Sequence, residues 1–275
     1  MKRILITGRD GFIGASLAQY FARFPEVYAA ETLKMRGHTP EEYDFSGADA
    51  IVHTAAIVHQ RETKKTRPLF DAVNCELTAA IAGKAKREGV KQFVFFSTIG
   101  VFGMVEGVIT DESVPAPRTR YERSKLEAER RIAELADDSF SVTIVRAPVV
   151  FGPGEKGNPA KLNRLSKKLP FCPDYKNRRT MVSIETLCAA TKALVDEPRS
   201  GIFYPKEREP VSTCDLIERA MREQGRTPKR SKLLNPLIRV LRACTRVGKK
   251  AFGDLVYEGA FARELPASDG KEANR

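Results

Sequence analysis

Short apolar runs that alternate with amphipathic stretches are the feature that most limits the folds open to this chain of 275 residues. The runs are continuous rather than alternating in polarity, which is typical of strands covered on both faces of a parallel sheet. Strand and helix repeating in turn favour an α/β fold, because parallel neighbours are joined by crossover helices. The pattern predicts strands at 3–7, 27–30, 50–53, 92–97 and 141–145, and helices at 13–24, 68–88 and 121–136.

The pattern breaks up after residue 150, where FGPGEKGNPAKL and KKLPFCPDYKNRRT are rich in glycine, proline and lysine. Such stretches are typical of loops. The strand and helix pattern returns in MVSI and the stretch that follows it. We therefore expect residues 1–151 and 181–204 to form the sheet domain, and residues 152–180 and 205–275 to form a smaller C-terminal lobe.

Three glycines follow the first predicted strand in ILITGRDGFIG and open the first predicted helix. Glycine permits the tight turn and lets the backbone approach a diphosphate, while the amides and the positive end of the helix face the anion. This context predicts a dinucleotide site in a Rossmann-type, doubly wound sheet, and a glycine-rich turn without a ligand is the alternative. The residues expected to line the site are Gly8, Arg9, Gly11, Phe12, Ile13 and Gly14.

The second predicted strand should end in an acidic residue that binds the adenosine ribose, roughly 20 residues after the glycines. Glu31 lies at this distance. Lys34 and Arg36 follow it, and Arg9 lies inside the glycine loop. Because cations at this place accept the 2′-phosphate of NADP, both NAD and NADP stay open as cofactors.

A third unit, YDFSGADAIVHTAA, supplies further candidate cofactor contacts. Open α/β sheets bind ligands at the carboxyl ends of their strands. We therefore expect Asp44 and Phe45 to border the adenine, and the small side chains of Ala55 and Ala56 to let the cofactor pass close to a strand end. Plain packing is the alternative for these small residues.

Thr98 follows the predicted strand at 92–97, and Tyr121 and Lys125 come later in YERSK, four residues apart and on one face of a helix. A phenol has a pKa of about 10, so it needs a nearby cation to act as a base at neutral pH. We expect Lys125 and an oxidised nicotinamide to supply that charge. Thr98 then hydrogen-bonds the reacting oxygen and Tyr121 exchanges its proton. The alternative is that Tyr121 and Lys125 lie on a solvated surface helix and have no catalytic role.

Six motifs spread over most of the chain are ITGRDGFIG, IVHTAA, VNCELTAAIAGKAKREGVKQFVFFSTIGVFG, YERSKLEAE, VRAPVVFGPG and RRTMVSIETL. With them the sequence resembles the extended short-chain dehydrogenase/reductases, specifically the NAD-dependent nucleotide-sugar epimerase/dehydratase family. Four later stretches resemble a bacterial subgroup that serves capsule and O-antigen sugar synthesis; they are GNPAKL, FCPDYKNRRTMVSIETLC, STCDLIERA and KAFGDLVYE.

The resemblance implies redox chemistry at C4 of a nucleotide sugar, with NAD or NADP as the cofactor, the smaller lobe as the substrate-binding lobe and a homodimer as the assembly. Family 4,6-dehydratases carry an Asp-Glu pair directly after the catalytic hydroxyl. Ile99 and Gly100 follow Thr98 here, which disfavours dehydration. The subgroup favours reduction of a UDP-4-keto-6-deoxy-N-acetylhexosamine with NADPH, and a UDP-sugar 4-epimerase with tightly bound NAD is the alternative.

The resemblance also implies substrate contacts. Arg179 matches the family's arginine that grips the nucleotide diphosphate, a role that suits a planar guanidinium. Asn158 fits a loop position near it, and His59 of AAIVHQ borders the sugar. A solvated loop residue is the alternative for Arg179 and for His59.

The net charge of +12 is concentrated between residues 215 and 250, where eleven Lys and Arg face three acidic residues. Within this stretch, LNPLIRVLRACTRVGKK predicts a helix with one apolar stripe, made of Leu237, Leu241, Cys244 and Val247. We expect the stripe to pack into the lobe. Weak association of the basic 237–250 helix with an anionic membrane surface is the alternative.

The basic charge also suits a protein of another class, a non-catalytic dinucleotide sensor or RNA-binding protein. Such a protein has no need of Thr98, Tyr121 and Lys125 together, so we expect an enzyme without a nucleic-acid partner.

The five cysteines are widely spaced and form no C-x-x-C pair, so we expect buried free thiols rather than disulfides or a metal site. The first apolar run is too short for a signal peptide, and no run approaches the roughly 18 apolar residues that span a bilayer. These features predict a cytoplasmic protein.

Overall fold

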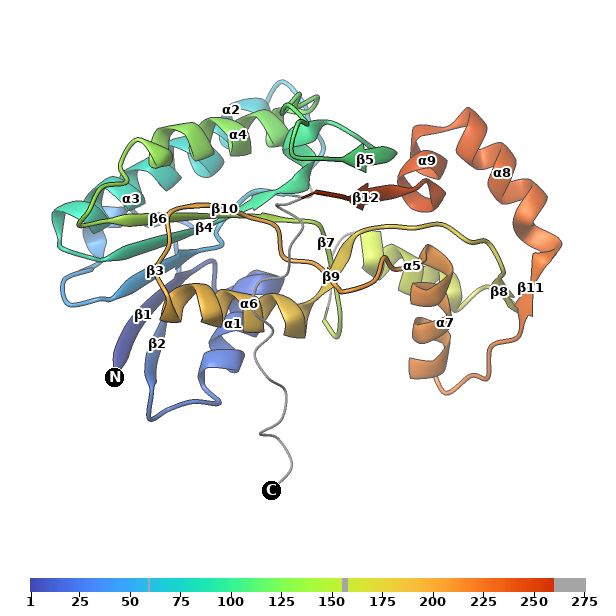
Figure 1. The fold of residues 1–275 in the computed structure, drawn as a ribbon, viewed down its shortest axis with the longest axis horizontal. Coiled ribbons are helices and arrows are strands. Elements are labelled where there is room, and N and C mark those ends of the chain that lie inside the picture. The colour runs from blue at the N-terminus through green and yellow to red at the C-terminus, as the bar shows by residue number, and fades with distance from the viewer. Residues whose placement is uncertain (59, 155–157, 260–275) are drawn as a thin grey trace.

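A computed structural model of the protein describes residues 1–58, 60–154 and 158–259. Its centre is a six-stranded sheet in the order β10-β6-β4-β3-β1-β2, and each neighbouring pair of strands is parallel (Figure 1). The predicted α/β fold with a doubly wound parallel sheet is confirmed. The strands are β1 (Lys2–Thr7), β2 (Tyr28–Leu33), β3 (Ala50–His53), β4 (Gln92–Thr98), β6 (Ser141–Ala147) and β10 (Gly201–Phe203).

Helices cover both faces of this sheet, as its continuous apolar strands require. One face carries α2 (Arg67–Asp71), α3 (Leu77–Arg87) and α4 (Arg120–Ala133), and the other carries α1 (Phe12–Phe21) and α6 (Ile184–Asp196) (Figure 1). Each layer has its own apolar core: Phe45, Phe93 and Phe95 belong to the first, and Phe21 and Phe96 to the second.

The predicted helix at 68–88 is not one regular helix. A π-helical turn, η2 (Ala72–Glu76), joins α2 to α3. The predicted strand at 27–30 is also displaced, because β2 ends only at Leu33. The other strand predictions agree with the structure to within two residues. Short 3-10 turns complete the sheet domain: η1 (Pro40–Glu42) and η3 (Ile99–Phe102).

The chain reverses direction across the sheet at β1, which has β2 on one side and β3 on the other. At this switch point the carboxyl ends of the strands open a crevice in which doubly wound sheets bind ligands. The register places Thr7 opposite His53, and Thr98 opposite Ala147, along this carboxyl edge. The edge therefore brings together the residues that follow β1, β3 and β4.

A smaller lobe lies beside the sheet (Figure 1). Its helices are α5 (Asn158–Ser166), α7 (Thr213–Glu223), α8 (Asn235–Cys244) and α9 (Arg246–Phe252), with the 3-10 turn η4 (Lys232–Leu234) before α8. Three two-stranded parallel pairs tie it together and to the sheet domain. They are β5 (Gly107–Ile109) with β12 (Leu255–Tyr257), β7 (Val149–Phe151) with β9 (Met181–Ser183), and β8 (Cys172–Pro173) with β11 (Arg230–Ser231).

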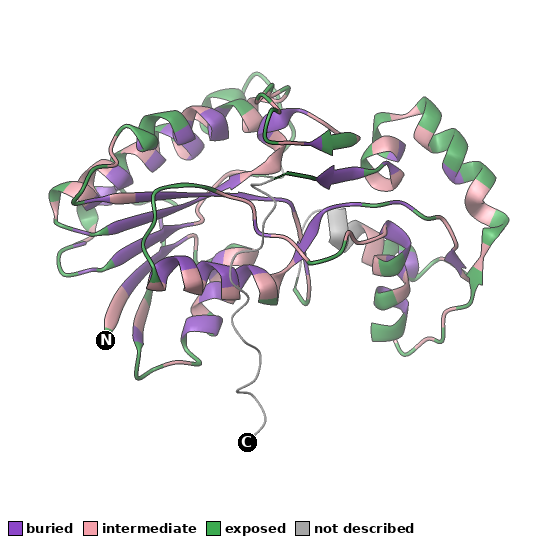
Figure 2. Cartoon of the chain, in the orientation of Figure 1, coloured by how far each residue is buried: buried purple, intermediate pink, exposed green. Residues whose placement is uncertain are grey.

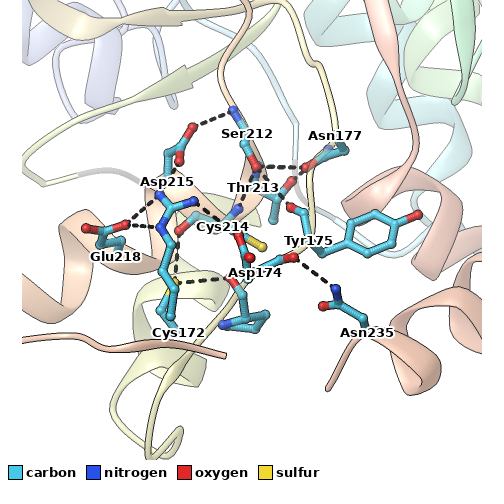
Figure 3. A network of polar contacts seen from close by, with 12 residues as sticks. Cys172, Asp174, Tyr175, Asn177, Ser212, Thr213, Cys214, Asp215, Glu218 and Asn235 are labelled. Carbon is cyan, nitrogen blue, oxygen red and sulfur yellow. Dashed lines mark hydrogen bonds and ion pairs between the residues drawn. The ribbon is translucent and has the colours of Figure 1, made fainter. Parts of the chain in front are cut away.

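The lobe has a small apolar core and an extensive polar network (Figure 3). Ser212 caps α7, because its hydroxyl accepts a hydrogen bond from the Cys214 amide at 3.2 Å. Asn177 bonds both the Thr213 amide and the Thr213 hydroxyl. Arg230 forms ion pairs with Asp215 and Glu218. Polar contacts therefore join α7 to the strands and loops around it in this lobe.

Burial differs between the two parts of the molecule, and Figure 2 shows far more exposed residues on the outer helices of the lobe than on the sheet. Four of the five cysteines are buried free thiols, as predicted, but Cys244 is exposed. No helix within the described ranges is both long and apolar enough to cross a membrane.

Candidate active site

The glycine loop after β1 forms a cradle that has no room for side chains. Gly8 has a φ of +84°, in the left-handed region that favours glycine. A Cβ on Gly8 would lie 2.8 Å from the Ala55 amide nitrogen, and a Cβ on Gly14 would lie 2.4 Å from the Gly8 carbonyl oxygen. The turn after β1 thus lies directly against the loop after β3. The structure brings Gly8, Gly14 and Ala55 together as the sequence predicts.

The amino end of α1 opens onto this cradle. Gly11 is the N-cap residue and supplies no side-chain hydrogen bond, so the first-turn amides of Phe12 and Ile13 have no cap. Uncapped amides at a positive helix end form an anion site. Arg9 lies exposed beside it, 3.9 Å from the carboxylate of Asp10. The cradle and the open helix end fit the diphosphate of a dinucleotide.

Glu31 does not lie at the end of β2. It is two residues before the strand ends, and its carboxylate accepts a hydrogen bond from Arg3 Nε at 2.9 Å. The prediction that Glu31 ends its strand is therefore wrong, because the strand is longer than its apolar run. Lys34 and Arg36 follow the true end of β2, and both are exposed. The carboxyl edge of β2 is thus cationic rather than acidic.

Asp44 and Phe45 are not at the carboxyl edge either. Phe45 is fully buried in the core beneath α3, so no part of its ring is left to contact adenine. The segment that follows lies beside the amino end of β1, since Arg3 donates to the Ser46 carbonyl. Asp44 is exposed there and accepts a hydrogen bond from the Ser46 amide. The apolar character of Phe45 reports packing rather than a binding site.

Thr98 and Tyr121 meet at the end of β4. Thr98 ends β4 and is the N-cap residue of η3, because its hydroxyl oxygen accepts a hydrogen bond from the Gly100 amide at 3.0 Å. Tyr121 lies in the first turn of α4, whose start is fixed by a capping box between Thr119 and Glu122. The Thr98 side chain lies close enough to the Tyr121 phenol to lower the pKa of that phenol. The hydroxyl and the phenol predicted to hold one reacting oxygen are therefore adjacent.

Burial raises the pKa of Tyr121 to about 12, and the Thr98 side chain opposes this rise only in part. The phenol is therefore protonated at neutral pH and is able to donate a proton. The expected lowering of this pKa by Lys125 together with an oxidised nicotinamide stays a prediction.

Lys125 is buried one turn further along α4. Its Nζ donates a hydrogen bond to the Phe96 carbonyl at 2.7 Å and lies 4.4 Å from the centroid of the Phe95 ring. Burial lowers the pKa of this amine to about 7, although the nearby Glu129 carboxylate favours the charged form. A buried amine with so low a pKa is typical of a functional site.

A buried ion pair stabilises α4 against the sheet beneath Lys125. Arg146 on β6 binds the Glu129 carboxylate through Nε and Nη2, and its Nη1 donates to the Tyr204 hydroxyl at 2.9 Å. Ser97 donates to the same carboxylate. These residues were not predicted from the sequence. The signal was present, because the apolar strand SVTIVRA and the helix KLEAERRIA each contain charged residues, and a charge that is buried needs a partner.

Asn74 is a further residue near the site that was not predicted from the sequence. The π-helical turn η2 points its side chain inward, where it bonds the amide of Ile57 at 2.8 Å and the carbonyl of Ile57 at 3.0 Å. Its Nδ2 also donates to Ser124 on α4. Asn74 therefore positions the loop after β3 against the helix that carries Tyr121 and Lys125.

The three predicted substrate residues have different outcomes. Arg179 is buried where the lobe meets the sheet domain; its Nη1 donates to the Gly253 carbonyl at 2.8 Å, and burial lowers the pKa of its guanidinium. Asn158 begins α5. His59 lies outside the described residues. Substrate contacts for all three stay predictions.

The sequence matches the model of the NAD dependent epimerase/dehydratase family over residues 4–203. It is 33% identical over 244 residues to a UDP-glucose 4-epimerase of Vibrio cholerae, covering 78% of this chain and 74% of that protein. A solved UDP-glucuronic acid 4-epimerase from Bacillus cereus in complex with NAD has a TM-score of 0.71 at 18% identity, covering 97% of this chain and 93% of that chain. A dTDP-4-dehydrorhamnose reductase from Bacillus anthracis in complex with NADP has a TM-score of 0.66 at 21% identity, covering 84% and 83%.

A glycine cradle at the switch point of a doubly wound sheet, beside a hydroxyl, a phenol and a buried amine, defines a dinucleotide-dependent redox enzyme. The family model spans well over half of the sequence, and the chain belongs to the NAD dependent epimerase/dehydratase family. The prediction of an NAD(P)-dependent enzyme of this family is thereby confirmed. The two solved neighbours show the same fold, one with NAD and the other with NADP.

Proposed function

We propose that the protein reduces a 4-keto nucleotide sugar, with UDP as the nucleotide, in the synthesis of surface polysaccharide precursors. The observation that carries the proposal is that Thr98 and Tyr121 lie together at the end of β4, where desolvation raises the pKa of the phenol to about 12. A protonated phenol is the form that reduction of a carbonyl requires.

Each residue of the site has a role in this reaction. A reduced nicotinamide, when bound, supplies the hydride that forms the new C–H bond at C4. Tyr121 donates its proton to the carbonyl oxygen and is reprotonated from solvent. Thr98 donates a hydrogen bond to the same oxygen, since its hydroxyl only accepts from the Gly100 amide and keeps its own proton for donation. Lys125 holds the ribose hydroxyls and favours the transient phenolate electrostatically.

NADPH is the cofactor that the end of β2 favours. Lys34 and Arg36 follow this strand and are exposed, whereas the nearest acid, Glu31, is paired with Arg3. The two cations suit the 2′-phosphate of NADPH. Binding of the two ribose hydroxyls of NADH would need a free carboxylate, and Glu31 is engaged by Arg3.

A UDP-sugar 4-epimerase with tightly bound NAD is the second candidate. It is favoured by the similarity to the Vibrio cholerae UDP-glucose 4-epimerase, which is 33% identical. Epimerisation at C4 needs the same hydroxyl, phenol and amine, but the phenol must first accept a proton. The high pKa of Tyr121 makes this step the harder one, unless an oxidised nicotinamide lowers the pKa when bound.

The two candidates are distinguished by the nucleotide that the purified protein carries and consumes. Reduction predicts loss of NADPH absorbance in the presence of a UDP-4-keto-6-deoxy-N-acetylhexosamine, with a cofactor that exchanges freely. Tightly held NAD, with interconversion of UDP-hexoses at C4 and no net consumption of NADPH, would support the epimerase instead. A protein that binds neither dinucleotide would contradict both.

Variants at the end of β2 test the cofactor directly. Lys34→Ala with Arg36→Ala should raise the KM for NADPH by about tenfold or more while leaving that for NADH unchanged, since charge-assisted hydrogen bonds contribute about 1.5–3 kcal/mol each. Glu31→Gln is the matched control: it should leave both KM values unchanged, because Glu31 binds Arg3. A rise in the KM for NADH in Glu31→Gln would restore Glu31 as the ribose ligand.

A further inference from the structure

The outer side of α8 and α9 exposes apolar side chains that the sequence analysis expected to be packed. Ile238 is the one residue of α8 that is buried. The α8–α9 face, as we call it, consists of four exposed apolar residues: Leu237 (57% exposed), Val240 (59%), Leu241 (41%) and Val247 (78%). Exposed patches of this kind mark interaction sites.

These residues form one stripe rather than scattered positions. At about 100° per residue, Leu237, Val240 and Leu241 lie on the same side of α8, and Ile238 faces the lobe. The backbone of Gly248 packs against Leu241, since a Cβ there would lie 2.1 Å from the Leu241 carbonyl oxygen. Val247 therefore lies next to the stripe. Figure 2 shows α8 largely exposed, whereas α9 is a mixture of exposed, intermediate and buried residues.

The exposure does not come from a loosely held helix. Asn235 donates a hydrogen bond to the Asp174 carbonyl at 2.9 Å, which fixes the start of α8 (Figure 3). Arg242 binds Glu106 at 2.7 Å and the Tyr175 hydroxyl at 3.1 Å, which fixes its far end. The helix is thus anchored on its inner side by Ile238 and these polar contacts, and its other large apolar side chains face outward.

The surroundings of the α8–α9 face are cationic. The sequence from 231 to 253 holds six Lys and Arg and no acidic residue. Among the described residues, Lys232, Arg239, Arg246 and Lys249 have no acidic side chain within ion-pair distance, whereas Arg242 is paired with Glu106. Apolar side chains bordered by unpaired cations are complementary to a surface that is apolar within and anionic at its rim.

We propose that the α8–α9 face docks the protein on the surface of an anionic lipid bilayer. The apolar stripe enters the boundary between headgroups and acyl chains, and the cations bind lipid phosphates. Each basic residue near an anionic leaflet contributes about 1 kcal/mol. Self-association through the same face is disfavoured, because it would bring two sets of unpaired cations together. Docking would hold the lobe, and with it the sugar site, next to the membrane.

Vesicle flotation tests the proposal without sugar or cofactor, so its result is independent of the proposed function. Full-length protein should float with vesicles made of equal parts phosphatidylglycerol and phosphatidylcholine, and not with pure phosphatidylcholine. Leu237→Glu with Val247→Glu should lower the bound fraction by about tenfold or more, since it removes apolar contact and adds repulsion. Val114→Glu is the matched control, because Val114 is 79% exposed on the loop before α4 and should leave binding unchanged.

A tryptophan reporter locates the contact. The chain has no tryptophan, so Leu237→Trp supplies a single emitter on the α8–α9 face. Its emission should shift to the blue on addition of the anionic vesicles, and that of Val114→Trp should not shift. A circular dichroism melt and the uptake of dinucleotide show that each variant is folded.

Three outcomes would overturn the proposal. The first is failure of the wild-type protein to float with anionic vesicles even at low salt. The second is flotation that persists in Leu237→Glu with Val247→Glu. The third is a concentration-dependent oligomer that this double variant converts to a monomer. The last outcome would make the α8–α9 face an interface between copies of the chain.

Discussion

α4 and α8 are both amphipathic helices rich in arginine, yet they divide their side chains between interior and solvent in opposite ways. α4 buries two charged residues, Lys125 and Glu129, together with its apolar ones. α8 buries Ile238 alone and leaves Leu237 and Val240 in solvent. The first arrangement costs free energy through desolvation, and the second through exposed apolar surface.

The two helices differ in the partners that surround their side chains. The charges of α4 are tolerated because Arg146, Ser97 and the Phe96 carbonyl satisfy them, and the result is an amine and a phenol held rigidly at the sheet edge. α8 has no such partners on its outer side within the described residues. The buried side chains of α4 are held by hydrogen bonds within the molecule, whereas the exposed apolar side chains of α8 would be stabilised only by a surface that covers them.

The largest expected effect is on catalysis by α4. Tyr121→Phe should lower kcat by about 10²–10⁴-fold while leaving dinucleotide affinity unchanged, because it removes the proton donor and keeps the ring. Single-turnover kinetics and cofactor titration measure the two quantities. Tyr28→Phe is the control: Tyr28 bonds Asp196 near the opposite end of β2, and its loss should leave kcat unchanged. Equal turnover in Tyr121→Phe and wild type would exclude the proposed mechanism.

The next effect concerns the buried ion pair. Arg146→Met leaves Glu129 uncompensated in the interior and should lower the free energy of unfolding by about 3–5 kcal/mol in urea denaturation. Arg131→Met, also on α4, breaks surface pairs with Glu76 and Glu127 and should cost less than about 1 kcal/mol. Similar costs for the two variants would mean that solvent reaches Glu129.

A smaller effect comes from the amine. Burial lowers the pKa of Lys125 from its usual 10.5 to about 7, so between these values the unfolded chain binds more protons than the folded one. Stability should therefore rise with pH from about 7 to 10, by at most about 1.4 kcal/mol per pH unit. The quantity to measure is the difference in unfolding free energy between wild type and Lys125→Met, in which other titrations cancel. A pH-independent difference would show that Lys125 is not desolvated.

The smallest effect is expected on the outer side of α8. Val240→Ser should change the free energy of unfolding by less than about 0.5 kcal/mol, because Val240 is already in solvent. Ile238 lies on the buried side of the same helix. Ile238→Ala should lower the free energy of unfolding by about 2–5 kcal/mol, since it leaves a cavity. A large loss of stability in Val240→Ser would show that the face is covered within the folded protein.

Much of the fold was predictable because its signals are local. The glycine loop, the strand ends at Thr7 and His53, and the spacing of Tyr121 and Lys125 are patterns a few residues long. Their meeting at one edge follows from the parallel sheet alone. These parts of the site needed no knowledge of distant contacts.

The errors have a different origin. Phe45 was assigned to the cofactor because an aromatic residue in a loop between two strands suits either a ligand or the core, and its complete burial in the structure decides for the core. Glu31 was misplaced because β2 continues past its apolar run by pairing with β1. The outer side of α8 was expected to be packed because an amphipathic helix carries no signal of whether anything covers it. Each of these depends on tertiary contacts that no short pattern encodes.

The π-helical turn between α2 and α3 fixes the number of residues that this part of the chain can contain. A π-helical turn holds one residue more than an α-helical turn, so residues 72–76 accommodate an extra residue between α2 and α3. Deleting one residue there would remove the turn that directs Asn74 inward, and Asn74 would release the loop after β3 that it bonds at Ile57. Insertions and deletions should therefore be excluded from this segment even where single replacements on its outer side are tolerated.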